Sequence, residues 1–161
     1  FARAGAEAIP SDDDSADAVV MFKSLHHVPV ESMETAMAEI ARVLRPGGLA
    51  YLSEPVFAGD FNEVLRLFHD ESGVRREAFE AVQRAVDGGV LELVEQRFFN
   101  VRNDFDDFAD FEERVLGVTH TEHDMSPELY ERVRRTFEGY MGPEGARFVM
   151  PMRVDLLRRP R

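Results

Sequence analysis

Apolar residues in the first third of the chain form two continuous runs separated by a helical pattern. Ala18–Phe22 is the first run, which predicts a strand that is buried on both faces. Apolar residues between positions 33 and 44 recur every three or four residues, which predicts a helix. A Pro-Gly-Gly sequence at 46–48 is a helix stop, and Leu49–Ser53 predicts a second strand. Because strand, helix and strand form a βαβ unit, we expect the two strands to be parallel.

The remainder of the chain predicts four helices, each marked by a capping residue. The first begins at Asp60 and the second at Ser72. A third begins at Asn103 or Asp104, and Ser126-Pro127 starts the fourth, with proline at the first helical position. Phenylalanines recur through this part at helical spacing, so most of them are expected in the core.

Two further strands are predicted beyond the βαβ unit. Val90–Phe99 mixes β-branched and aromatic residues, which favours a strand. From Phe148 to Leu156, apolar and polar residues alternate, which predicts a strand with one apolar face. Pro151 lies within this alternation and lacks an N–H for the sheet, so we expect a local irregularity there.

Length, composition and charge exclude several classes of protein. The chain has 161 residues, a formal net charge of −12 and no cysteine. The acidity argues against nucleic-acid partners and against an anionic membrane surface. Without cysteine there are no disulfides or thiolate metal sites. No apolar run approaches the roughly 18 residues of a membrane span, and no signal peptide is present, so a cytoplasmic protein is expected.

Four segments in the first 50 residues carry a family resemblance. They are Ala6–Pro10, Asp17–Val20, Leu25–Val28 and Glu39–Gly48, in this order and at family-like spacing. Together they resemble the second half of the class I S-adenosylmethionine (SAM) dependent methyltransferase domain of small-molecule enzymes, a group that includes quinone C-methyltransferases. The rest of the chain, from about Phe57 on, resembles this family only in the order of its elements.

The resemblance implies a partial Rossmann-like α/β fold. The family has a seven-stranded, mostly parallel sheet with helices on both faces. Ala18–Phe22 would be its fourth strand and Leu49–Ser53 its fifth, followed by a sixth and an antiparallel seventh. Strands one to three would precede Phe1, so residues 1–161 would be the C-terminal part of one domain. Helices within residues 57–145 would include a substrate cap.

The resemblance also indicates which part of a SAM site is missing. In the family, a glycine-rich loop after the first strand holds the methionine part of SAM. The only glycine series here is Gly139, Gly142 and Gly145, and no apolar strand precedes it. We therefore expect SAM binding by this chain alone to be weak or absent.

Residues for one wall of the SAM site are nevertheless expected. In the family, the loop that corresponds to Ala6 and Glu7 lies on the adenine. The end of the fourth strand, here Phe22, Lys23 and Leu25, passes close to the reactive methyl group. Lys23 is the only lysine in the chain.

Two histidines follow the predicted fourth strand, at the end where ligands gather in open α/β sheets. His26 or His27, with His26 preferred, is a candidate general base that deprotonates the acceptor. The alternative is that one histidine packs and caps the next helix while the other faces solvent. Glu54 and Phe57 follow the predicted fifth strand and are candidate substrate contacts. Glu54 could instead cap the next segment.

Two polar clusters raise the question of a metal site. His120–Asp124 holds four potential ligands in five residues, but it is predicted to be a loop and its spacing is not a known zinc pattern. The acidic turn Asp12–Asp14 is too short for a calcium-binding loop of the EF-hand type. We predict no metal, and a solvated linker or a lid for His120–Asp124.

These observations favour SAM-dependent methyl transfer to a small hydrophobic or aromatic acceptor by the complete domain. They argue against catalysis by this chain alone. The alternative is a non-catalytic methyltransferase-like remnant that assembles with partners or binds a ligand. If Ala18–Phe22 is an outer strand, its open edge needs cover. That cover would be a homodimer or larger assembly, or a preceding part of the parent polypeptide.

Overall fold

The computed structural model describes residues 3–117 and 125–161, so His120–Asp124 lies outside the described residues. The chain forms two compact units. The first, here called the sheet unit, comprises the chain up to Val56, Gly73–Phe99 and Met152–Arg161. The second, here called the helical unit, comprises Phe57–Ser72 and Asn100–Pro151. No helix in the described part of the chain is long and apolar enough to cross a membrane.

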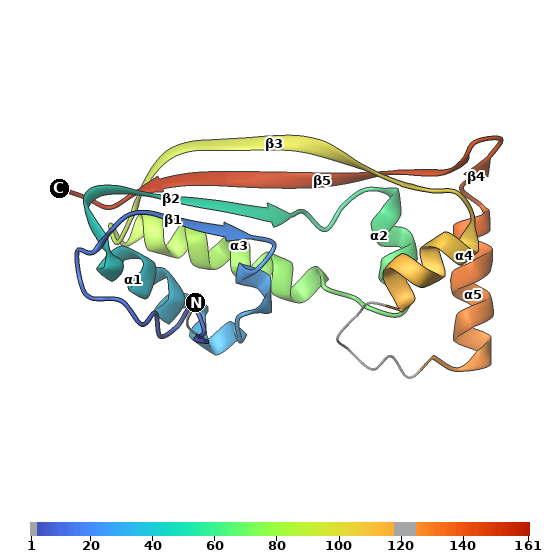
Figure 1. The fold of residues 1–161 in the computed structure, drawn as a ribbon, viewed down its shortest axis with the longest axis horizontal. Helices are drawn as coiled ribbons and strands as arrows, with labels where there is room; N and C mark the ends of the chain where they lie inside the picture. Colours follow the sequence, from blue (N-terminus) through green and yellow to red (C-terminus); the bar gives the residue numbers. More distant parts are fainter. Residues whose placement is uncertain (1–2, 118–124) are drawn as a thin grey trace. The chain divides into compact units, whose positions relative to one another are not determined.

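The sheet unit is built from strands joined by two long helices and two 3-10 turns. In chain order the elements that form it, wholly or in part, are β1 (Ala16–Phe22), η1 (Leu25–His27), η2 (Val30–Ser32), α1 (Met33–Val43), β2 (Leu44–Pro55), α3 (Ser72–Asp87), β3 (Glu92–Phe105) and β5 (Gly145–Arg158). The strands lie in the order β1-β2-β5-β3 (Figure 1). β1 is parallel to β2 and β5 is antiparallel to β2, which confirms both predictions of strand direction.

The Pro-Gly-Gly sequence belongs to β2 and not to a turn before it. The predicted helix ends at Val43, and β2 begins at Leu44, where its pairing with β1 is irregular. Gly47 donates its N–H to the carbonyl of Arg159 (3.0 Å), and Arg159 donates its own to the carbonyl of Gly48 (2.9 Å). These bonds to the end of the chain extend β2 beyond the predicted Leu49–Ser53, and sequence spacing alone does not reveal them.

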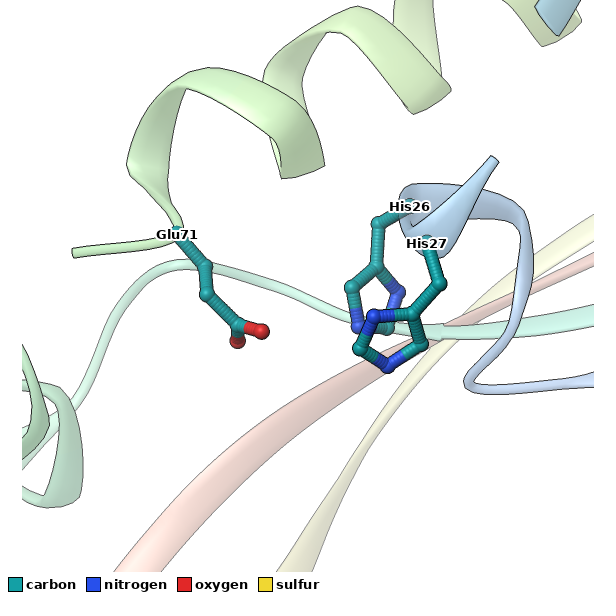
Figure 2. Close-up of side chains that lie close together, drawn as sticks. All are labelled: His26, His27 and Glu71. Carbon is teal, nitrogen blue, oxygen red and sulfur yellow. The ribbon is translucent and has the colours of Figure 1, made fainter. Parts of the chain in front are cut away.

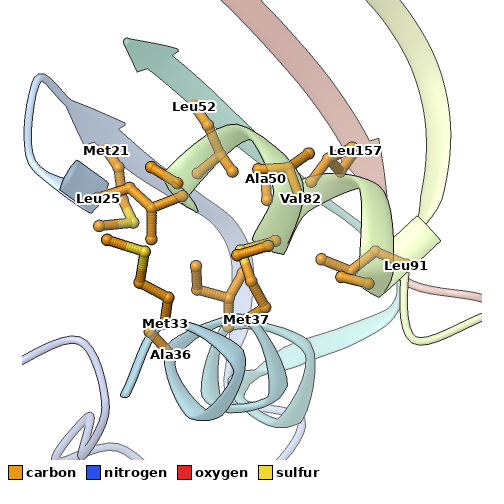
Figure 3. Packing of buried hydrophobic residues seen from close by; sticks show 14 of the residues in the cluster. Met21, Leu25, Met33, Ala36, Met37, Ala50, Leu52, Val82, Leu91 and Leu157 are labelled. Carbon is orange, nitrogen blue, oxygen red and sulfur yellow. The ribbon is translucent and has the colours of Figure 1, made fainter. Parts of the chain in front are cut away.

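One face of the sheet carries the core of the sheet unit. Side chains from β1, β2 and β5 point toward α1 and α3, and Met37, Leu52 and Val82 meet in this cluster (Figure 3). Because strand side chains alternate, Ala50, Leu52 and Glu54 of β2 share this covered face. The covered face therefore becomes polar at the end of β2, where Glu54 follows two apolar residues.

The opposite face of the sheet is open among the described residues. Val20 and Phe22 of β1 are 53% and 66% exposed. A groove on this face is lined by Tyr51, Glu95, Arg97, Phe99, Val154 and Leu156. β1 is the first strand in the sheet order, so its outer edge has no partner strand within the described residues.

The helical unit is organised around phenylalanines. Its elements are α2 (Asp60–Leu65), α4 (Phe108–Phe111), the π-helix η3 (Glu112–Leu116), α5 (Pro127–Glu138) and β4 (Met141–Gly142), with parts of β3 and β5. The buried rings that form its core are Phe61, Phe105, Phe111, Phe137 and Phe148. The prediction that α5 starts at Ser126-Pro127 is confirmed, since the Ser126 hydroxyl accepts the N–H of Leu129 (3.2 Å).

The predicted helix start at Asn103 or Asp104 is wrong. β3 continues as a strand to Phe105, whose ring enters the phenylalanine core. The helix starts after Asp107, whose carboxylate accepts the N–H of Asp110 (2.9 Å). Several acidic residues in this segment could serve as caps, and the burial of Phe105 decides between them.

Candidate functional site

The candidate site lies where β1 ends and the chain turns into η1. Lys23 adopts a left-handed conformation (φ +48°) and donates its N–H to the carbonyl of Ser53 on β2 (2.7 Å). The turn that follows carries His26 and His27, whose rings lie side by side with centroids 4.1 Å apart (Figure 2). His26 is 5% exposed, whereas His27 is exposed.

Glu54, near the end of β2, holds this turn in place. Its Oε1 accepts the backbone N–H groups of Ser24 (3.0 Å) and Leu25 (2.9 Å). Its Oε2 bonds Nδ1 of His26, and both side chains are about 96% buried. The carboxylate therefore fixes the backbone of η1 and the orientation of the His26 ring together.

The same contacts keep Glu54 ionised. Burial raises the pKa of the Glu54 carboxyl, but the hydrogen bonds from His26 and from the amides of Leu25 and Ser24 outweigh burial, so its pKa falls below the ordinary value of 4.5. An ionised carboxylate only accepts hydrogen bonds, so Nδ1 of His26 is the donor. In a neutral imidazole the lone pair then lies on Nε2, which is the atom that can accept a proton.

Ala6 and Glu7 lie in a short turn that α1 braces. Ala8 donates its N–H to the carbonyl of Gly5 (3.2 Å), and Ala6 packs against the core of the sheet unit. Beyond the turn, Ile9 donates its N–H to Glu39 Oε2 (3.0 Å) and accepts from Arg42 Nη2 (2.9 Å).

Glu39 and Arg42 belong to the segment Glu39–Gly48 that carries part of the family resemblance, and the structure shows what they do. They lie three residues apart on α1, and Arg42 Nε donates to Glu39 (2.7 Å). Arg42 also donates to the carbonyl of Ser11 (2.8 Å) and to Asp13 (2.6 Å). The Arg42 hydrogen bond lowers the pKa of the Glu39 carboxyl, and Glu39 followed by Asp13 raises the pKa of Arg42. Their spacing of three residues on a predicted helix could have indicated this ion pair.

The remaining predicted site residues have different surroundings. The ring of Phe22 is exposed on the open face of the sheet, near Tyr51 (centroids 5.7 Å apart). The side chain of Leu25 is fully buried in the core, and its amide is bonded to Glu54. Phe57 is half-buried in a bend of the helical unit. The structure thus brings together Glu54, Leu25 and His26, and the functional roles of all these residues stay predictions.

The residues predicted to contact SAM all belong to one wall of the expected site. They provide the braced turn at Ala6 and the end of β1 at Phe22 and Lys23. Of the glycine series considered above, Gly139 caps the end of α5, Gly142 belongs to the two-residue strand β4, and Gly145 is the first residue of β5. None of these three glycines connects a buried strand to a helix, which is the arrangement that positions a phosphate or cofactor on backbone amides in open α/β folds.

Comparison with known proteins finds a family match in the first part of the chain. Residues 1–52 match the family described as a methyltransferase domain. An uncharacterised methyltransferase of Mycobacterium ulcerans is 40% identical over 79 residues, which is 48% of this chain and 30% of the relative. One from Mycolicibacterium paratuberculosis is 41% identical over 76 residues, or 47% of this chain and 29% of the relative. The matched region thus spans about a third of these relatives.

Solved structures share the fold of nearly the whole chain. A putative methyltransferase from Bacillus halodurans has a TM-score of 0.64 and 18% identity, and the match covers 99% of this chain and 71% of that one. The YcgJ protein of Bacillus subtilis has a TM-score of 0.60 and 17% identity, with 97% and 69% covered. The fold is therefore α/β and Rossmann-like. The family match over residues 1–52 agrees with the resemblance to class I SAM-dependent methyltransferases.

The Glu54→Gln variant tests the buried pair. A pKa below the ordinary value means that ionised Glu54 stabilises the fold above pH 4.5, and that this stability is lost as pH falls through the folded-state pKa. We expect Glu54→Gln to lower the free energy of unfolding by about 1–3 kcal/mol at pH 7. The difference from the unsubstituted chain should shrink toward pH 3. Urea unfolding across this range measures it, with the exposed Glu92→Gln as control; a difference independent of pH would contradict the assignment.

The Arg42→Gln variant tests the bracing of the turn at Ala6. Losing the guanidinium removes donors to Ile9, Ser11 and Glu39, so the Ile9 amide should exchange with solvent about fivefold faster or more. Hydrogen exchange followed by NMR gives the rate. Arg45→Gln is the matched control, because Arg45 is also near the end of α1 and pairs only with the exposed Asp17 among the contacts described. Equal exchange in both variants would show that Arg42 does not hold the turn.

Proposed function

We propose that this chain is the C-terminal part of a SAM-dependent methyltransferase whose acceptor is a small hydrophobic or aromatic molecule. The observation that carries the proposal is the buried Glu54–His26 pair at the carboxyl ends of β1 and β2. In open α/β sheets this is the end at which ligands bind. The methyltransferase match over residues 1–52, which includes both strands up to Leu52, supports the same reading.

His26 is the proposed general base. SAM supplies the methyl group on a sulfonium, so methyl transfer needs a base only where the acceptor must lose a proton. Glu54 holds Nδ1 of His26 as the donor, and Nε2 then takes the proton from an O–H or activated C–H group of the acceptor. Burial of the pair keeps water from competing for its hydrogen bonds. His27 is exposed and is the second choice for this role.

The complete domain is proposed to include strands that precede β1. The apolar side chains of Val20 and Phe22 are exposed at the edge of the sheet, which is unfavourable for a strand of this composition. Strands and helices placed before β1 would cover this edge and supply the glycine-rich loop for SAM. Methyl transfer is accordingly assigned to the complete protein, and SAM binding by this chain alone is expected to be weak.

The exposed edge of β1 also favours a second candidate function. A second copy of the chain pairing along β1 would satisfy its open edge without any further segment. The chain would then be an assembling, non-catalytic relative of the methyltransferases. A concentration-independent monomer by light scattering would argue against this alternative.

Transfer of a labelled methyl group from SAM by the complete encoded protein tests the proposed function. With a panel of phenols and other small aromatic acceptors, we expect labelled product from at least one. His26→Gln should lower its rate about 100-fold or more, the range for loss of a general base. Glu92→Gln is the control, because Glu92 is an exposed residue at the start of β3.

Two results would contradict the proposal. A complete protein that neither binds SAM nor transfers a methyl group would exclude the enzyme function. Unchanged activity in His26→Gln would exclude His26 as the base. Calorimetry on the 161-residue chain provides a separate check, because micromolar SAM binding there would contradict an incomplete cofactor site.

A further inference from the structure

A second buried polar residue lies next to Glu54 on the covered face of the sheet. In the antiparallel ladder between β2 and β5, Arg153 is the direct partner of Glu54. Side chains of directly paired residues lie on the same face, with Cβ atoms about 5 Å apart. Arg153 is 5% exposed and its neighbour on this face, Asp155, is fully buried. The end of β2 and the adjoining part of β5 therefore bring together the Glu54–His26 pair and a buried guanidinium.

Two contacts fix the plane of this guanidinium, and a third orients the carboxylate that it bonds. Arg153 Nε donates to Asp155 Oδ2 (2.7 Å), and Gln96 of β3 donates to Asp155 Oδ1 (2.7 Å). The Arg153 Cζ lies 4.0 Å from the centre of the Phe79 ring on α3. An arginine held by a carboxylate at one edge and an aromatic ring on one face has little rotational freedom. Its other donors consequently point in a set direction.

One of those donors has no acceptor. Nη2 of Arg153 is buried and makes no hydrogen bond among the described residues. A buried charged donor without a partner is costly, and folded proteins satisfy the large majority of such groups. Gln96 occupies the second oxygen of Asp155, and the Glu54 carboxylate is taken up by His26 and two backbone amides. The nearby acidic groups are therefore already engaged.

We propose that Arg153 Nη2 binds the phenolic or enolic oxygen of the acceptor as that oxygen becomes negative. The acceptor O–H bond breaks, its proton goes to Nε2 of His26, and the electron pair stays on the oxygen beside Nη2. Charge favours an acceptor that arrives neutral over a permanent anion. With neutral His26, the buried groups Glu54, Arg153 and Asp155 already sum to −1, and a neutral acceptor adds nothing to this total.

This inference rests on the proposed function for the identity of the ligand, but its test does not involve SAM. 4-Nitrophenol is the probe, because its phenolate and phenol forms differ in visible absorbance. Titration of the 161-residue chain into 4-nitrophenol below the probe's own pKa should raise the phenolate fraction. 4-Nitroanisole, which has no acidic proton, should bind at least tenfold more weakly.

Matched variants distinguish binding by Arg153 from a nonspecific effect of positive charge. Arg153→Met combined with Asp155→Asn removes both buried charges and should weaken nitrophenol binding about tenfold or more. Arg97→Met is the control, because Arg97 lies on β3 with its side chain 74% exposed on the open face of the sheet, and it should bind as the unsubstituted chain does. Arg153→Lys keeps the charge that Asp155 requires but lacks the Nη2 donor. It should weaken binding several-fold, and it carries the test if the double variant does not fold.

Equal phenolate fractions with the unsubstituted chain and with a folded Arg153 variant would overturn the inference, as would the absence of any phenolate signal. Failure of the proposed function would look different. Arg153-dependent nitrophenol binding in a complete protein that never transfers a methyl group would retain the oxyanion site and exclude the enzyme.

Discussion

A carboxylate buried at the end of a strand stays charged only if hydrogen-bond donors surround it, and the candidate site is built on this requirement. Glu54 is 3% exposed, and its donors come from a single short turn, η1. Its ionisation and the conformation of that turn are therefore coupled, because each requires the other. The coupling joins the end of β2 to the segment after β1 and gives His26 a defined orientation.

The neighbouring strand β5 adds a positive charge, the guanidinium of Arg153. Arg153 is paired through Nε with Asp155, while the ladder places it across from Glu54. Two buried acids and one buried base on the same face are expensive to desolvate, and hydrophobic residues at these positions would pack with less penalty. Such an arrangement is typical of a functional site, where a fold tolerates polar burial for chemistry.

Sequence patterns predicted the elements that depend on local information. The apolar runs predicted the parallel pair β1 and β2, the alternation from Phe148 predicted the strand β5, and Ser126-Pro127 predicted the start of α5. The antiparallel direction of β5 came from the family resemblance. His26 was selected because it follows a strand that was predicted to be buried; one face of that strand, β1, is in fact open. The wrong predictions concern element boundaries that are set by residues distant in the sequence. Hydrogen bonds with Arg159 extend β2 through the Pro-Gly-Gly sequence. Burial of Phe105 in the phenylalanine core prolongs β3. Glu54 was predicted to contact substrate. Its contact with His26 and the position of Arg153 depend on the register of the strands, which the sequence alone does not provide.

The tautomer of His26 is the most direct measure of this account. Long-range ¹H–¹⁵N correlation spectra of the 161-residue chain near neutral pH report which ring nitrogen carries the proton. In the neutral form of His26 we expect the proton on Nδ1, with loss of this preference in Glu54→Gln. A His26 ring protonated at Nε2, or a tautomer ratio unchanged by Glu54→Gln, would contradict the claim that Glu54 orients this histidine.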